Sequence, residues 1–145
     1  MADLSDFSEL STPERGLVVV GTARADGSIH ASLVNAGVLP HPVSGNPTLA
    51  FVTYGRVKLA NLRARPWATV TARAGWRWVS VEGRAEIVGP DDRLPGVEAA
   101  DLPGLLRAVF VAAGGTHDDW AEYDRTMAEQ RRAAVLLTPT RVYSN

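Results

Sequence analysis

The chain has 145 residues, an apolar fraction of 46% and a formal net charge of −1. This length and apolar content predict one globular domain over residues 1–145 that buries its own core. The near-neutral charge argues against nucleic-acid binding, and the absence of cysteine excludes disulfides, thiolate catalysis and Cys-ligated metal. No apolar run has membrane-spanning length and the N-terminus is not signal-like, so we expect a cytoplasmic protein that does not contact membranes.

The first part of the chain predicts a short helix and three strands. The helix is expected over residues 5–10, and β-branched apolar runs predict strands over residues 17–24, 29–38 and 48–53. Asp26-Gly27 separates the first two strands and is typical of a hairpin turn, because glycine adopts positive φ without steric cost.

The most informative segment follows the third predicted strand, at residues 54–66. It carries Arg56, Lys58, Arg63 and Arg65, and a proline closes it. A short helix is expected here, and the N–H groups at a helix start favour negative charge. Arg56 and Lys58 can add charge-assisted hydrogen bonds to a phosphate or carboxylate. The alternative is an ordinary solvated basic helix.

The remainder predicts three strands and two helices. Strands are expected over residues 67–73, 76–88 and 133–142, with Pro139 ending the last one at a sheet edge. Helices are expected over residues 102–113 and around residues 120–127. This order predicts a small, mainly β barrel of the α+β class with helices packed outside it.

Common catalytic and metal-binding motifs are missing from the chain. His30, His41 and His117 lack metal-ligand spacing, so no metal site is expected, and His30 and His41 are interpreted as surface residues. Trp76 and Trp78 stand two apart in a predicted strand, where they could stack on a planar ring. Packing in the core or at a dimer interface is the alternative for both.

Together these features resemble the pyridoxamine-phosphate-oxidase-like split-barrel superfamily, and within it the actinobacterial group that uses the deazaflavin coenzyme F420. The resemblance covers nearly the whole chain. The matching motifs are Asp26-Gly27, Arg56-x-Lys58-x-x-Asn61-Leu62-x-x-x-Pro66, Gly75-Trp76-x-Trp78 with Glu82-Gly83, Trp120-x-x-Tyr123 and Arg141-Val142-Tyr143.

The resemblance implies a homodimer of six-stranded antiparallel split β-barrels with flanking helices, and a cofactor at the dimer interface. The cofactor phosphate would lie at the turn that carries Arg56 and Lys58. The second strand, the end of the third strand and the fifth strand, the last from the same or the partner subunit, would line the ring. The residues that the resemblance assigns to cofactor binding are Ser32, Asn35, Val52, Thr53, Arg56, Lys58, Asn61, Trp76, Trp78 and Val79.

The implied function is F420-dependent hydride transfer to an unsaturated small-molecule substrate. No catalytic side chain is evident, so the proton would come from solvent or from Tyr143. Two alternatives remain open from the sequence: a non-catalytic F420-binding or carrier protein, and an FMN-dependent oxidoreductase of the same fold.

Overall fold

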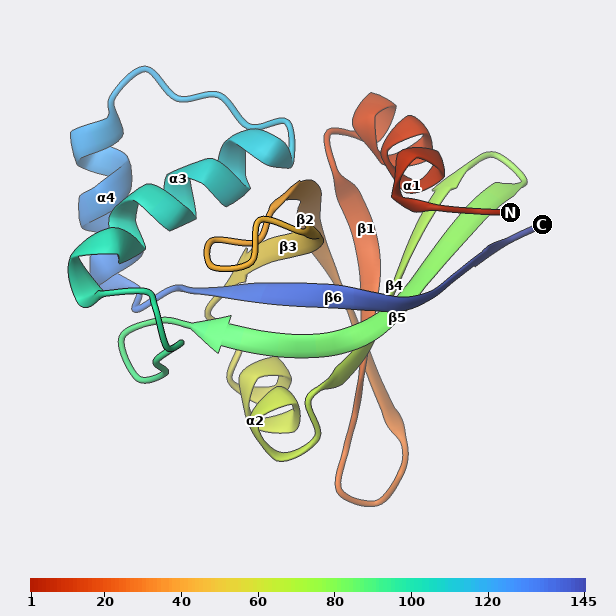
Figure 1. The fold of residues 1–145 in the computed structure, drawn as a ribbon, viewed down its shortest axis with the longest axis horizontal. Helices are drawn as coiled ribbons and strands as arrows, with labels where there is room; N and C mark the ends of the chain where they lie inside the picture. Colours follow the sequence, from red (N-terminus) through yellow and green to blue (C-terminus); the bar gives the residue numbers. More distant parts are fainter.

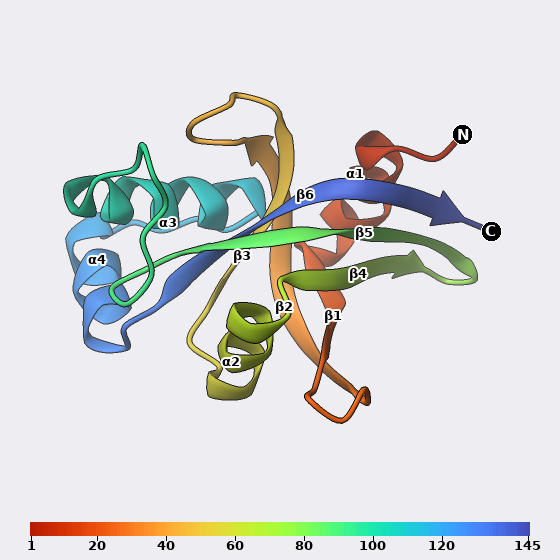
Figure 2. The same ribbon diagram turned by 60° about the horizontal axis from the view of Figure 1, so that its bottom comes forward.

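The computed structural model describes all 145 residues, and its centre is a closed antiparallel β-barrel. The strands follow each other around the barrel in the order β1-β2-β3-β6-β5-β4 (Figures 1 and 2). Their bounds are β1 (Leu17–Ala23), β2 (Ile29–Pro40), β3 (Pro47–Thr53), β4 (Trp67–Ala74), β5 (Arg77–Val88) and β6 (Ala133–Ser144). This architecture confirms the six-stranded split barrel expected from the sequence.

Four helices and two 3-10 turns surround the barrel. Helix α1 packs on β4 and β5, α2 packs on β1 and β5 at a different end, and α3 packs mainly on β2 (Figure 1). None of these helices has the length and apolar character that crossing a membrane requires. Their bounds are α1 (Leu4–Ser11), η1 (Thr12–Glu14), α2 (Arg56–Ala64), η2 (Ala99–Asp101), α3 (Leu102–Ala112) and α4 (Trp120–Glu129).

The core has two parts, because the strands bury side chains on both sides where a helix covers them. Inside the barrel, alternate residues such as Val18 and Val20 point inward, and Phe7 of α1 is fully buried among them. A second cluster lies under α3 and α4, where Val109 and Tyr123 pack on the outer face of β6. The second cluster holds the two long helices against the barrel.

Strand β2 changes partner along its length, and this change creates the split in the barrel. Residues 29–35 pair with β1, whereas residues 36–40 pair with β3, beginning at Ala36 opposite Phe51. Beyond that pair, Val52 and Thr53 of β3 pair with β6. The start of β2 and the end of β3 therefore separate, and α2 follows β3 directly at this split.

Pro139 does not end β6, which corrects the expectation of an edge there. Proline lacks the N–H that a strand partner needs. Here β3 stops pairing with β6 at Leu137, and β6 bulges at Thr140, the extra residue opposite the Glu82–Gly83 step of β5, so the register continues past the proline. The bulge brings the β5 backbone close to β6, since a Cβ on Gly83 would lie 2.2 Å from the carbonyl oxygen of Thr138.

Trp76 lies outside the strand that the sequence assigned to it. Strand β5 begins at Arg77, and Trp76 occupies the preceding turn with 94% of its surface exposed. Gly75 adopts a positive φ of 61° in this turn, and the chain reverses there before the strand begins. Trp76 and Trp78 therefore do not share a strand face.

His41 is not a free surface side chain, in contrast to the sequence interpretation. Its Nε2 lies 2.8 Å from Oε1 of Glu86, and its Nδ1 accepts hydrogen bonds from the backbone N–H groups of Val43 and Ser44. The imidazole therefore ties the loop between β2 and β3 to β5.

Candidate functional site

Lys58 joins α2 to β2 across the split. Its side chain is buried, and Nζ donates a hydrogen bond to Oγ of Ser32 at 2.5 Å. Burial lowers the pKa of Lys58, and no carboxylate lies within ion-pair distance to offset the effect. An ammonium group has three donors, so the single bond to Ser32 leaves this cation short of acceptors.

The start of α2 adds further donors beside this ammonium. The helix begins at Arg56 after Gly55, and no side chain caps its first turn. Thr53 Oγ1 accepts the N–H of Gly55 at 3.1 Å, which fixes the entry of the chain into the helix. A Cβ on Gly55 would lie only 3.6 Å from Nζ of Lys58, so the ammonium lies beside the helix start. Amide dipoles and ammonium together favour an anion here.

Arg56, Lys58, Ser32 and Thr53 lie together at the start of α2, although the resemblance assigned Arg56 and Lys58 to the phosphate and Ser32 and Thr53 to the ring. Asn61 has a different position. Asn61 is buried, and its Nδ2 donates to Oγ1 of Thr22 at 3.0 Å. This bond anchors α2 to β1 inside the barrel end. Arg56 is exposed at the first helical position and forms no ion pair.

His30 lies beside Ser32 and is partly buried, whereas the sequence interpretation placed it on the surface. It lies on the same face of β2 as Ser32, opposite Thr22 of β1. Its Nδ1 is fully buried and has no hydrogen-bond partner in the chain. Such an atom carries a desolvation cost, which makes it a second unsatisfied polar group near Lys58.

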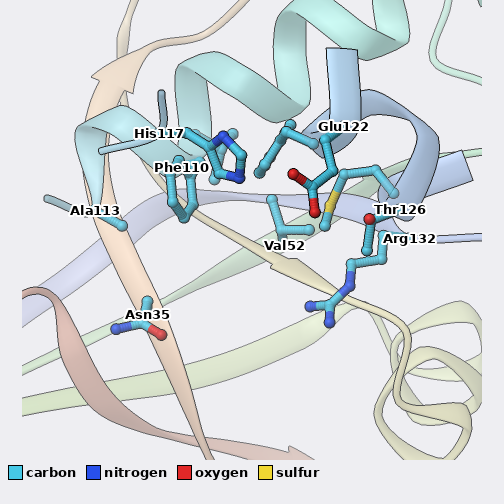
Figure 3. Close-up of a pocket in the computed structure, with 11 residues that line it drawn as sticks. Asn35, Val52, Phe110, Ala113, His117, Glu122, Thr126 and Arg132 are labelled. Atoms are coloured by element: carbon cyan, nitrogen blue, oxygen red, sulfur yellow. The ribbon is translucent and has the colours of Figure 1, made fainter. Parts of the chain in front are cut away.

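Asn35 and Val52 line a cavity of about 430 Å³ between the barrel and helices α3 and α4 (Figure 3). Asn35 Nδ2 donates to the carbonyl of Arg15 at 3.0 Å, which holds the amide at the cavity floor. Figure 3 shows the ring of His117 and the carboxylate of Glu122 reaching toward the space above Val52. The cavity lies beside the split and opens on residues from both of its strands.

The far wall of the cavity is aromatic and rigid. Phe110 lies 5.0 Å from Tyr123 between ring centroids, and the hydroxyl of Tyr123 donates to the Leu106 carbonyl at 3.0 Å. Burial raises the pKa of Tyr123, so it stays a neutral donor. An ion pair between Arg107 and Asp124 further joins α3 to α4. The sequence spacing of residues 120–127 predicts the helix but not the cavity.

Trp76, Trp78 and Val79 are not brought to α2 within one chain. The β4–β5 turn lies near the two termini, at a different end of the barrel from α2 (Figure 1). Trp78 packs edge-on against Tyr143, with ring centroids 6.0 Å apart, and Val79 is buried in the barrel interior. Val79 therefore presents its side chain to the core and not to the surface.

Tyr143 is hydrogen-bonded to Glu82 and does not line the cavity. Its hydroxyl donates to Oε2 of Glu82 at 2.5 Å, and this hydrogen bond raises the pKa of the tyrosine. A proton on Tyr143 is therefore retained more firmly than on a free tyrosine. Within one chain this residue lies with Trp78 on the outer face of β5 and β6.

The chain is similar to proteins of known family and structure. The family model described as pyridoxamine 5'-phosphate oxidase matches residues 8–145. A conserved hypothetical protein from Mycobacterium tuberculosis superposes with a TM-score of 0.68 and 21% identity, over 99% of this chain and 84% of that chain. A structure described as an F420 reductase gives a TM-score of 0.59 and 20% identity, over 94% of each chain.

A third similar structure is a pyridoxamine 5'-phosphate oxidase-related, FMN-binding protein from Nostoc punctiforme. It gives a TM-score of 0.60 and 12% identity, over 97% of this chain and 81% of that chain. At these identities the three structures establish a shared fold, while the family model spans nearly the full length of the sequence. The chain belongs to the pyridoxamine 5'-phosphate oxidase family.

Proposed function

We propose that the protein is an F420-dependent oxidoreductase that reduces an unsaturated small molecule. The observation that carries the proposal is Lys58, a buried ammonium at an uncapped helix start with one hydroxyl partner and no carboxylate. A site of this kind fits the phosphate of a flavin-type cofactor. The fold shared with a protein described as an F420 reductase supports the deazaflavin reading.

The residues around the split fit the rest of such a cofactor. Lys58, Arg56 and the first amides of α2 would hold the phosphate, with Ser32 positioning the ammonium. Asn35 and Val52 would flank the ring, since they face a cavity from both sides of the split. A reduced deazaflavin, when bound, supplies a hydride, and the protein's part is to bind it, orient it and exclude water.

A homodimer is part of the same proposal. The outer face of β1 and β2 exposes Leu17, Val19, Ile29 and Leu33, with Ile29 59% and Leu33 63% accessible. Apolar side chains clustered on one sheet face favour burial against a partner. A second copy of this chain seated there would cover these residues and could bring its Trp78 region toward the cofactor.

An FMN-dependent enzyme and a non-catalytic cofactor carrier are the competing functions. FMN also carries a phosphate on a ribityl chain, so Lys58 would accept either cofactor, and one protein of the same fold is described as FMN-binding. The deazaflavin carries additional carboxylates in its tail, which favour a wider basic surface. Turnover of unsaturated substrates with reduced cofactor would separate an enzyme from a carrier.

The decisive experiment is titration of the purified protein with F420 and FMN side by side. We expect tighter binding of F420, with a preference that shrinks as salt rises because the tail acts through long-range attraction. Lys58→Met should weaken binding by about 1.5–3 kcal/mol, the range for a charge-assisted hydrogen bond. Arg93→Met, which removes an exposed cation from the loop after β5, is the matched control.

Equal or tighter binding of FMN at low salt would refute the deazaflavin assignment. Unchanged affinity of the Lys58→Met protein for both cofactors would refute the anion site itself. Each outcome tests a different part of the proposal, since the first concerns the tail and the second concerns the phosphate.

A further inference from the structure

Arg132 is held in place by its neighbours while its terminal nitrogens stay free. Its guanidinium lies over the ring of Tyr54, with Cζ 4.1 Å from the centroid, and its Nε donates to Oε1 of Gln130 at 2.8 Å. Neither Nη atom donates a hydrogen bond within the chain, and no carboxylate lies within ion-pair distance. Tyr54 and Gln130 therefore fix the orientation of the planar guanidinium, while no protein acceptor binds its two Nη atoms.

The backbone reinforces this placement. Helix α4 ends in a Schellman motif, in which the N–H of Arg131 donates to the carbonyl of Ala128 and the N–H of Arg132 donates to that of Met127. Arg131 takes the left-handed conformation with φ of 51°. The chain thus turns sharply from α4 into β6, and this turn puts Arg132 at the edge of the cavity (Figure 3).

The cavity walls that face Arg132 are flat and apolar. Phe110, Tyr123 and Met127 form one side and Val52 forms the floor. A volume of about 430 Å³ is within the range of sites that hold small organic molecules. Glu122 is the one carboxylate among the lining residues, and its charge disfavours an anion at its own end, so an anionic ligand group is directed to Arg132.

We propose that this cavity binds a flat, conjugated carboxylate, with the carboxylate on the Nη atoms of Arg132 and the conjugated part against Phe110 and Tyr123, beside the position at Asn35 and Val52 proposed for the cofactor ring. Guanidinium and carboxylate match in a planar, two-bond geometry that an ammonium does not offer. The identification of this ligand as a substrate rests on the proposed function. The double bond of a 2-enoate takes up a hydride, which the proposed cofactor supplies, and a proton from water, and the product is the saturated carboxylate.

Cinnamate is a suitable probe, and binding to the cofactor-free protein is measured by calorimetry. We expect a Kd below about 1 mM for the unmodified protein. Arg132→Gln should weaken binding by about ten-fold to a hundred-fold, and Arg132→Lys should recover only part of the loss. Arg131→Gln is the matched control. It removes the same charge from the residue next to Arg132, whose own ion pair with Asp91 is exposed, and it should leave the affinity for cinnamate unchanged.

Three outcomes would overturn the inference. They are no binding of cinnamate to the unmodified protein, equal weakening by Arg131→Gln, and equally tight binding of cinnamyl alcohol, which lacks the carboxylate. F420 titration of the Arg132→Gln protein is run in parallel with thermal melting to check folding. If that variant loses F420 and cinnamate does not bind the unmodified protein, Arg132 serves the cofactor instead. If F420 fails to bind the unmodified protein while cinnamate binds through Arg132, only the substrate assignment falls.

Discussion

Replacement of Gly37 by alanine tests how closely α3 approaches the barrel. A Cβ at this position would lie 2.2 Å from the carbonyl carbon and oxygen of Ala112 and 2.5 Å from the N of Ala113, whereas ordinary contacts begin at 3.4 Å. The obstructing atoms are backbone at the end of α3, so no side chain can turn away. The helix end would have to retreat by about 1 Å, and overpacking of this severity costs about 2–3 kcal/mol.

The same substitution at Gly104 serves as the control, with the opposite sign expected. Gly104 lies in the first turn of α3, and an added Cβ would meet no atom within 4 Å. Alanine should therefore stabilise the protein by about 0.5–1 kcal/mol through better helix propensity and a less flexible unfolded chain. Both variants are measured by urea unfolding of the cofactor-free protein at one pH.

A Gly37→Ala protein within about 0.5 kcal/mol of the unmodified protein would show that α3 does not pack on β2 as described, because ordinary surface substitutions have effects of that size. Since Asn35 lies two residues from Gly37, displacement of α3 should also weaken cinnamate binding. The Gly104→Ala protein should bind cinnamate normally.

Three further predictions concern charge, backbone strain and assembly. Burial lowers the folded-state pKa of Lys58 below 10.5, so the unfolded chain binds more protons just below that pH, and the unfolding free energy of the cofactor-free protein should rise as pH approaches 10.5. Urea unfolding of Lys58→Met over the same pH range should lack this part of the rise. Identical pH profiles of the two proteins would contradict the burial of Lys58. Arg131→Gly should raise the unfolding free energy by about 1 kcal/mol, because glycine adopts the left-handed conformation freely and the lost ion pair with Asp91 is exposed. A variant that is less stable than the unmodified protein in thermal and urea unfolding would argue against backbone strain at Arg131. Leu33→Asp should shift the mass in light scattering from dimer to monomer, with Thr140→Asp as an exposed control outside the apolar face; a monomeric unmodified protein would exclude the proposed dimer.

Local patterns were sufficient to predict most of the barrel. Runs of β-branched residues placed the strands within a few residues, and the Asp26-Gly27 turn paired the first two. The errors arose where a distant neighbour decides the outcome. Pro139 stays within β6 because β3 has already stopped pairing there and β6 bulges at Thr140 against Glu82 and Gly83 of β5, which lie far away in the sequence.

The residues of the candidate site also fall into those that a local sequence pattern marks and those that only the fold brings together. Lys58 and Arg56 could be found because glycine, cations and a helix start stand together in the chain. Arg132 and His117 could not, since their role depends on a cavity that joins β2, β3, α3 and α4. The stacking of Arg132 on Tyr54 joins residues from opposite halves of the sequence, and no local pattern marks either of them.

The two parts of the site rest on separate segments, and this separation has an evolutionary consequence. The donors proposed to bind an anion come from α2, which packs on β1 and β5, whereas most of the cavity walls come from α3 and α4, which pack against β2, β3 and β6. Mutations that reshape the α3–α4 connection at residues 113–119 can thus change what the cavity accepts while Lys58 and Ser32 keep their contact. Proteins built on this barrel can therefore diverge in what the cavity binds without changing the helix start that carries Lys58.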